Sequence, residues 1–196
     1  MFTGIVTDVG RVRAVRQTNR DRRFEIETRF DLATIDIGAS IAHAGCCLTV
    51  VEKGEGWFAV EVSGETLSRT TLDAWVEGTP IILERAARVG DELGGHIVSG
   101  HVVGVGQIVS VTAEGGSHRV RVRVPRPLHR YIAEKGSITI EGVSLTVNEV
   151  EDDVFGVNLI PHTWDVTTLG RLTPGDRVNL EIDMLARYLA RWRETA

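Results

Sequence analysis

The sequence predicts an all-β protein in which two tandem antiparallel β-barrels are followed by a short C-terminal α-helix. The first observation behind this prediction is an internal repeat: 16 of the 45 residues from Ser40 to Glu84 are identical to the residue 97 positions further on. A self-match at a fixed period indicates a repeated structural unit. The second is that each copy consists of five or six short alternating segments separated by turn residues, which is typical of a closed antiparallel barrel. The periodic helices that parallel βαβ units require are missing.

The repeat is clearest in one stretch of each copy. Residues 38–50 are G-A-S-I-A-H-A-G-C-C-L-T-V, and residues 136–147 are G-S-I-T-I-E-G-V-S-L-T-V. At one matched point Cys47 is replaced by Ser144, within a shared frame of Gly, Ser-Ile, Gly and Leu-Thr-Val. Over residues 4–10 the offset is 96 rather than 97, so one residue is inserted or lost in between. The repeat therefore predicts two similar pockets with unequal chemistry.

In the first copy, the alternation of apolar and polar residues predicts a series of strands. They span residues 3–17, 23–28, 38–50 with a break near Gly45, 57–63 and 79–85. Asp31 is a suitable N-cap for a helical turn over residues 31–35. Residues 53–56 (K-G-E-G) predict a turn, and residues 64–73 predict a short helix or turn.

The second copy repeats this order after a glycine-rich junction at residues 88–100. Its expected elements are strands at 101–111, 119–124, 136–147, 154–160 and 177–183, a short helix opening with prolines at 125–134, and a turn at 151–153. Each copy is about 90 residues long, which is enough for a core without a metal or a disulfide. We therefore divide the chain into two barrel domains, residues 1–88 and 95–183, and a C-terminal helix, residues 184–196.

The C-terminal segment differs from both copies. Leu185, Tyr188, Leu189 and Trp192 recur at helical spacing, and arginines lie on the other faces. A helix this short is marginal in water by itself, so its apolar face must dock somewhere. It either packs on its own barrel or packs against the same helix of other subunits. The second arrangement is favoured, because each barrel is already complete.

Composition argues against several classes of protein. The 22 basic residues are interspersed with 27 acidic ones and the net charge is −5, whereas a nucleic-acid-binding surface requires clustered positive charge. No run approaches the roughly 20 apolar residues of a membrane span, and the N-terminus has no basic-then-apolar signal segment. The two cysteines, Cys46 and Cys47, are adjacent and cannot cross-link distant segments. We therefore expect a reduced, cytoplasmic protein with no nucleic-acid or membrane partner.

The sequence also carries no signal for a metal or a nucleotide cofactor. The six histidines are dispersed, and the spacing of His96 and His101 points them to opposite faces of a strand. No G-x-G-x-x-G follows a predicted strand, and Lys135-Gly136-Ser137 has the wrong order for a phosphate-binding loop. We therefore expect no metal and no cofactor.

Five segments, in order along the chain, carry a resemblance to a known family. They are M-F-T-G-I-V at the N-terminus, residues 38–50, G-G-H-I-V-S-G-H at 94–101, G-V-S-L-T-V at 142–147 and L-I-P-H-T at 159–163. Together they resemble the riboflavin synthases of the two-barrel alpha-chain type, over essentially the whole chain. The resemblance implies two six-stranded barrels, a C-terminal helix and a homotrimer.

The resemblance also implies an activity. The family joins two molecules of 6,7-dimethyl-8-ribityllumazine by transfer of a four-carbon unit, which gives riboflavin and a ribitylamino-pyrimidinedione without a cofactor or a metal. The reacting pair sits between the N-terminal barrel of one subunit and the C-terminal barrel of another. The alternative is a non-catalytic lumazine- or flavin-binding protein of the same fold. In such relatives one pocket typically loses its polar groups, whereas here both pockets keep them.

By this resemblance, substrate binding falls on matched residues of the two copies. The first pocket is expected to contain Gly4, Ile5, Val6, Cys47, Leu48, Thr49, Glu61, Val62, Ser63, Gly64, Glu65 and Thr66. The second is expected to contain Gly100, His101, Val102, Lys135, Ser144, Leu145, Thr146, Asn158, Leu159, Ile160, Pro161, His162 and Thr163. Because the two sets coincide under the internal offset, the repeat and the resemblance support each other.

The residues expected to take part in the reaction are His101, Cys47, Ser144, Ser40, Phe2 and Asp183. Cys47 is either a small buried apolar residue or a contact of the bound ring that helps to deliver a nucleophile. Ser144 either satisfies a backbone group or makes a polar contact with the ring. His101 replaces Ile5 within a matched triplet, and a neutral imidazole suits proton transfer near pH 7.

Purely structural interpretations remain open for the other positions. Phe2 is either a mobile lid that excludes water or a residue that packs at a strand end. Ser40 has an identical partner in Ser137, so a structural hydrogen bond explains it nearly as well as a role in activity. Asp183 matches a family position that is linked to activity. His43 and His96 are expected to belong to the framework.

Overall fold

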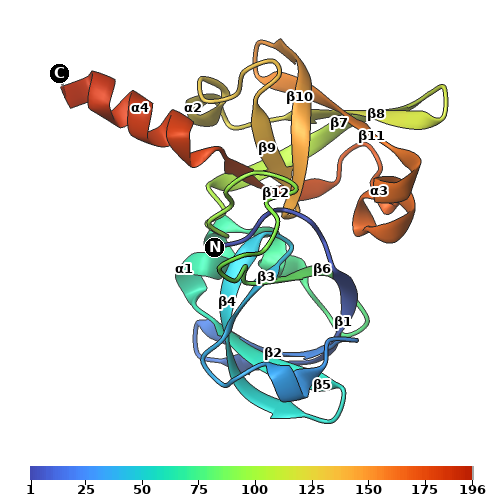
Figure 1. Ribbon diagram of the computed structural model, residues 1–196, viewed down its shortest axis with the longest axis vertical. Helices are drawn as coiled ribbons and strands as arrows, with labels where there is room; N and C mark the ends of the chain where they lie inside the picture. Colours follow the sequence, from blue (N-terminus) through green and yellow to red (C-terminus); the bar gives the residue numbers. More distant parts are fainter. Residues whose placement is uncertain (196) are drawn as a thin grey trace.

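Each copy of the repeat forms a closed barrel of antiparallel strands in the computed structural model, which describes residues 1–195 (Figure 1). The first barrel consists of β1 (Asp8–Thr18), β2 (Asp21–Glu27), β3 (Ser40–His43), β4 (Cys46–Gly54), β5 (Trp57–Val62) and β6 (Pro80–Arg85). The second consists of β7 (Gly104–Glu114), β8 (Ser117–Arg123), β9 (Ser137–Ile140), β10 (Val143–Glu151), β11 (Val154–Leu159) and β12 (Arg177–Ile182). The prediction of two tandem six-stranded barrels is confirmed.

Both barrels have the same strand order. Around the first barrel it is β1-β2-β5-β4-β3-β6, and around the second it is the equivalent β7-β8-β11-β10-β9-β12. The pairing shifts register at matched points, between Val12 and Ala14 in β1 and between Ile108 and Ser110 in β7. Such bulges bend a strand and increase its twist, which helps a sheet to close on itself.

Short helices connect the strands, and a longer helix follows β12. They are η1 (Leu32–Thr34), α1 (Gly64–Arg69), η2 (Thr71–Ala74), α2 (Arg126–His129), α3 (Pro161–Val166), η3 (Thr168–Arg171) and α4 (Met184–Thr195). Asp31 caps η1 as predicted, because its carboxylate accepts a hydrogen bond from the N–H of Ala33 at 3.0 Å. The predicted C-terminal helix is present, and its last expected residue, Ala196, lies outside the described residues. No helix within residues 1–195 is long and apolar enough to cross a membrane.

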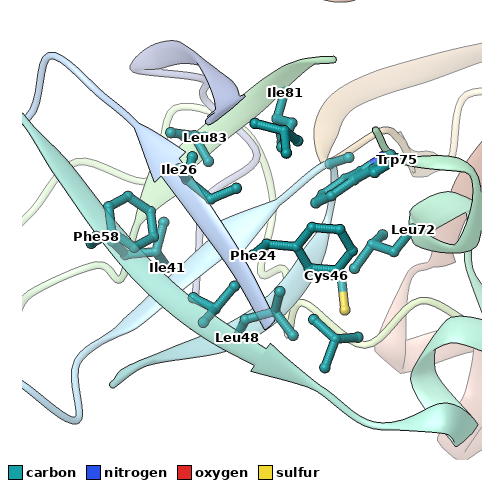
Figure 2. Packing of buried hydrophobic residues seen from close by; sticks show 14 of the residues in the cluster. Phe24, Ile26, Ile41, Cys46, Leu48, Phe58, Leu72, Trp75, Ile81 and Leu83 are labelled. Carbon is teal, nitrogen blue, oxygen red and sulfur yellow. The ribbon is translucent and has the colours of Figure 1, made fainter. Parts of the chain in front are cut away.

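Apolar residues of alternate strand positions fill the two barrel interiors. In β4, Cys46, Leu48 and Val50 are buried, whereas Cys47 is half-buried and Thr49 is exposed. Figure 2 shows Cys46 and Leu48 in the first core, among side chains of the other strands and of η2. The alternation that predicted strands is therefore the division between barrel interior and outer surface.

The hairpin turns of the two central stretches meet at the junction of the barrels. Ala44 and Gly45 have φ values of 46° and 82°, and Glu141 and Gly142 have 52° and 84°, as a two-residue type I′ turn requires. A Cβ atom on Gly45 would lie only 2.8 Å from the backbone N of Gly142. The two turns thus pack backbone against backbone. Equivalent residues of the copies meet here, as around an approximate two-fold axis.

The first strand of each copy begins later than predicted. The alternation suggested strands from residues 3 and 101, but β1 begins at Asp8 and β7 at Gly104. The residues before these strands leave the barrel and run along the junction, where Phe2 and Val98 form an isolated antiparallel bridge. Val6 and Val102 pack on the core of the other copy, whereas Ile5 is exposed, so an apolar pattern extends beyond the strand itself.

We predict that Glu141 makes the protein less stable as the pH rises. Its carboxylate accepts a hydrogen bond from the N–H of Asn179 at 2.6 Å, and burial raises the pKa of Glu141 from 4.5 to about 8. Between these pH values the folded state holds a proton that the unfolded chain has lost, so the free energy of unfolding falls. Glu141→Gln keeps the acceptor oxygen and removes the charge. Relative to the parent, the free energy of unfolding of Glu141→Gln should increase by about 1 kcal/mol or more between pH 5 and pH 9.

Urea unfolding of both proteins at pH 5, 7 and 9 measures this difference. All other titrating groups are common to the two proteins, so only the pH dependence of the difference between their free energies of unfolding reports on Glu141. A difference that stays constant across this pH range contradicts the prediction.

Candidate active site

Buried carboxylates hold the segments that precede each barrel. Glu84 on β6 accepts hydrogen bonds from the backbone N–H and the hydroxyl of Thr3, at 2.7 and 2.8 Å, and from the N–H of Gly4 at 3.1 Å. Burial raises the pKa of Glu84, while these donors act to lower it. Its equivalent, Glu181 on β12, accepts from the N–H and the hydroxyl of Ser99, both at 2.7 Å. Each carboxylate therefore fixes one glycine-containing segment to its own barrel.

From these anchors, each glycine segment reaches the other barrel. The carbonyl oxygen of Gly4 accepts a hydrogen bond from the N–H of Ser144 at 2.9 Å, and that of Gly100 accepts from the N–H of Cys47 at 2.8 Å. Both glycines have a φ of 77°. A Cβ atom on Gly4 would lie 2.5 Å from the Cβ of Ser144, and one on Gly100 would lie 2.6 Å from the Cβ of Cys47. Only glycine fits such an approach.

The expected grouping of the pocket residues is therefore wrong. Matched positions suggested that Gly4–Val6 would share a pocket with Cys47, and Gly100–Val102 with Ser144. The structure brings Gly4–Val6 to Ser144 and Gly100–Val102 to Cys47. The valine of each triplet packs on the core of the other barrel. The physical reason is the two-fold arrangement of the copies, which makes each segment cross the junction.

The remaining expected binding residues lie on neighbouring strands of each barrel. β4 pairs with β5, so Cys47–Thr49 lie beside Glu61–Thr66, which span the end of β5 and the start of α1. In the second barrel, Ser144–Thr146 lie on β10 beside Asn158–Thr163, which span the end of β11 and the first half of α3. Ser63 caps α1 through a hydrogen bond from the N–H of Thr66 at 3.2 Å. The structure thus brings together the strand residues expected for each pocket.

The matched residues Cys47 and Ser144 have different surroundings. Cys47 is a free thiol that packs on the cluster of Phe2, Ala42 and Val98. The Ser144 hydroxyl instead lies 2.7 Å from Nδ1 of His96, within hydrogen-bond distance. The two matched positions therefore have different chemical surroundings.

Two cavities flank the glycine segments. Ile5 lines one of about 600 Å³ together with Thr3 and Glu84. His101, the equivalent of Ile5, lines another of about 820 Å³, where Tyr131 also lies. Neither cavity includes Cys47–Thr49 or Ser144–Thr146 among its lining residues. The side chains of Ile5 and His101 are exposed, so their triplets meet the strand residues through the backbone rather than through these side chains.

Comparisons with known proteins agree with this duplicated arrangement. The sequence profile of the family described as Lumazine binding domain matches residues 3–86 and again residues 99–183. The chain is 50% identical over 196 residues to riboflavin synthase of Brucella abortus (strain 2308), covering 97% of each chain. It is 43% identical to riboflavin synthase of Mycobacterium tuberculosis (strain ATCC 25618 / H37Rv), covering 100% of both. The chain belongs to the riboflavin synthase family.

Solved structures support the same relationship. The crystal structure of LumP complexed with riboflavin has a TM-score of 0.85 and 27% identity, and it covers 93% of this chain and 100% of LumP. LumP complexed with 6,7-dimethyl-8-(1'-D-ribityl) lumazine has a TM-score of 0.82 and 27% identity, covering 92% and 98%. The full-length match to riboflavin synthases is thus accompanied by the fold of a protein that binds both molecules.

The other residues expected from the riboflavin synthase resemblance are dispersed. Phe2 is only 1% exposed and its N–H donates to the Val98 carbonyl at 2.7 Å, so it packs at the junction, the simpler of its two expected places. Asp183 accepts from the N–H of Leu185 at 2.9 Å, beside the start of α4. Ser40 begins β3 and is half-buried. Lys135 is exposed.

His96, which is expected to belong to the framework, lies beside an expected site residue. Its imidazole lies against Ser144 and is only 9% exposed. The available signal was its position in G-G-H-I-V-S-G-H, directly before the second glycine segment. The sequence could not show that this segment meets β10, because the contact is formed in three dimensions.

We predict that Gly4→Ala is more destabilising than Gly38→Ala. Both glycines have positive φ, at 77° and 90°, so an alanine is strained at either position. At Gly38 a Cβ atom meets nothing within 4 Å, whereas at Gly4 it collides with Ser144. The difference in unfolding free energy should be about 1 to 3 kcal/mol, the usual cost of overpacking. Urea unfolding measures it, and equal losses in the two variants would show that the Gly4 segment does not contact Ser144 in solution.

Proposed function

We propose that this protein is a riboflavin synthase. It transfers a four-carbon unit between two molecules of 6,7-dimethyl-8-ribityllumazine, and gives riboflavin and 5-amino-6-ribitylamino-pyrimidinedione. The reaction uses no cofactor and no metal. A cytoplasmic location fits the adjacent free thiols of Cys46 and Cys47, since free cysteines persist in reducing compartments.

The observation that carries this proposal is the pair of related but unequal pockets. Two identical substrates that react with each other need two similar sites that impose opposite roles. One site combines Gly4–Val6 with Ser144–Thr146, and the other combines Gly100–Val102 with Cys47–Thr49. The shared backbone frame suits one substrate skeleton, and the exchange of Cys47 for Ser144 differentiates the two copies. The binding and catalytic residues named from the resemblance are part of this proposal.

A homotrimer completes the proposal. In Figure 1, α4 projects away from both barrels. Leu185, Tyr188, Leu189 and Trp192 on this helix are 60% to 73% exposed. This favours packing of residues 184–196 against other subunits over packing on the helix's own barrel. Of the strand residues in the two pockets, Thr49 and Thr146 are exposed and Cys47 and Ser144 are half-buried, so a neighbouring subunit can cover them. The reacting pair would then lie between barrels of different subunits.

The function is tested with purified protein and 6,7-dimethyl-8-ribityllumazine. Absorbance and fluorescence distinguish the lumazine from riboflavin, so turnover is followed directly. We expect the lumazine to be consumed and riboflavin to form without any added metal or nucleotide. Binding of the lumazine without conversion would instead identify a non-catalytic lumazine-binding protein and overturn the proposal.

We predict that His101→Ile binds the lumazine but turns it over at least about 10²-fold more slowly. The reason for this loss is that the His101 imidazole is proposed to assist a proton transfer in the reaction. Isoleucine already occupies the matched position, Ile5, so folding should be preserved. Cys47→Ser, which removes the other difference between the copies, should be milder, because a hydroxyl can still contact the ring or orient a water molecule.

The measurement is the rate of riboflavin formation per chain for each variant, alongside a direct titration of the lumazine. Parental turnover in His101→Ile contradicts a role for the imidazole in proton transfer. If His101→Ile loses lumazine binding as well as turnover, His101 is a ligand contact only.

We predict that deletion of residues 185–196 shifts the oligomer towards monomers while the barrels remain folded. Burial of Leu185, Leu189 and Trp192 contributes on the order of 5 kcal/mol per chain, which is large compared with a weak interface. Because the reacting pair is proposed to lie between subunits, the truncated protein should lose activity on dilution. Sedimentation and circular dichroism measure the two effects. An unchanged trimer after truncation would refute the role of α4.

A further inference from the structure

A second set of exchanges between the two copies surrounds α3. This helix begins directly after β11, and its first residues, 161–163, are among those expected to bind the lumazine. At positions matched by the repeat and by strand register, the first copy has Arg22, Ser63, Leu67 and Asp73, and the second has His118, Ile160, Trp164 and Gly170. The copies therefore hold the matched helices α1 and α3 in different ways.

In the first copy, α1 is fixed by a polar cap and a buried leucine. The Ser63 hydroxyl accepts a hydrogen bond from the N–H of Thr66 at 3.2 Å, as a side chain at the N-cap should. Leu67 is buried in the core of the first barrel. Arg22 points its guanidinium to the Asp73 carbonyl oxygen and donates to it at 2.6 Å. None of these interactions involves a stack of rings.

In the second copy, a stack of two rings holds α3 instead. Ile160 occupies the N-cap of α3 and has no polar side chain with which to cap it, and it is 57% exposed. The imidazole of His118 on β8 stacks on the indole of Trp164, with ring centroids 3.7 Å apart and an interplanar angle of 10°. His118 is also paired with Leu159 between β8 and β11, directly before the start of α3. The stack therefore joins β8 to the helix that carries expected pocket residues.

The surroundings of Trp164 are built to accept its large side chain. Trp164 packs on the core of the second barrel, where the first copy has the smaller Leu67. A Cβ atom on Gly170 would lie 2.3 Å from the Trp164 carbonyl oxygen and 3.2 Å from its Cδ1, so a side chain such as that of the matched Asp73 does not fit here. Nδ1 of His118 is buried without a hydrogen-bond partner among residues 1–195. Packing, rather than a hydrogen bond at this atom, holds the imidazole.

We propose that the stack of His118 on Trp164 positions α3 and thereby sets the affinity of the second pocket for the lumazine. This inference rests on the proposed riboflavin synthase function. His118 acts through Trp164 and is therefore a positioning residue. When α3 is in place for only a fraction of the time, the apparent affinity falls by that fraction. A fully bound pair of substrates still reacts from the same geometry, so the maximal rate is retained.

Two variants of His118 test this role in the full-length protein. His118→Ala removes the stacked ring, and His118→Phe keeps a planar ring that can stack on Trp164 but has no ring nitrogen. We expect His118→Ala to weaken binding of 6,7-dimethyl-8-ribityllumazine and to raise its KM by about fivefold, in line with the strength of an aromatic pair. Its kcat should stay within about twofold of the parent. His118→Phe should restore both affinity and KM.

Three comparisons separate positioning from a general loss of structure. Trp164→Leu, which installs the residue of the first copy, should weaken lumazine binding like His118→Ala, and the double variant should bind no more weakly, because the same stack is lost once. Arg22→Ala, the matched control in the first copy, should leave lumazine affinity near the parental value. The N–H of Trp164 donates to the Ile160 carbonyl at 3.0 Å. Its hydrogen exchange should be faster in His118→Ala and parental in His118→Phe.

Parental lumazine affinity in His118→Ala, or an equal loss in His118→Phe, would overturn the proposal. A fall in kcat at unchanged KM would also overturn it, because the imidazole would then act in the reaction itself. If His118→Ala does not fold, Trp164→Leu compared with Trp164→Phe decides the question in the same way. A parent that forms riboflavin while the variants keep their affinity refutes the positioning role alone. A parent that binds the lumazine but forms no riboflavin refutes the proposed function, and the affinities still decide the role of the stack.

Discussion

Hydrogen bonds from Thr3 and Ser99 to the buried carboxylates of Glu84 and Glu181 constrain the rest of the molecule. A carboxylate taken out of water is costly unless donors satisfy it, and here both backbone and hydroxyl donors do so. These anchors hold the two glycine segments against the opposite barrels. The same interactions therefore join the barrels and bring Gly4 to Ser144 and Gly100 to Cys47. Fold and site cannot be altered independently at these positions.

The duplicated frame leaves room for unequal chemistry. Gly4 and Gly100 share their conformation and their close approach to the partner strand, and both central hairpins turn through the same two-residue conformation. These backbone contacts do not depend on whether the strand carries Cys47 or Ser144. Side chains at the matched point can thus diverge without disturbing the scaffold. The asymmetry between the two copies is a property of a few side chains placed on a nearly symmetrical backbone.

Much of the fold could be predicted because it is encoded locally. Alternation of apolar and polar residues marks the barrel interior, and the helical spacing of Leu185, Leu189 and Trp192 marks α4. The cap of η1 depends on Asp31 alone. The incorrect strand boundaries lie where residues contact parts of the chain that are distant in sequence. Residues 3–7 alternate like a strand, but Val6 packs on the core of the other copy and Ile5 is exposed, and β1 begins only at Asp8.

The candidate site separates what the sequence determined by itself from what the tertiary structure decided. The internal offset was sufficient to identify equivalent residues, to locate the strands that carry Cys47 and Ser144, and to show that the two copies differ chemically at this point. Only the tertiary structure decided that Gly4 meets Ser144, that Gly100 meets Cys47, and that His96 lies against the Ser144 hydroxyl. A repeat specifies which residues correspond, whereas contact depends on how the two copies are oriented. Their approximate two-fold arrangement sends each segment to the other copy, and nothing in the order of residues along one chain records that crossing.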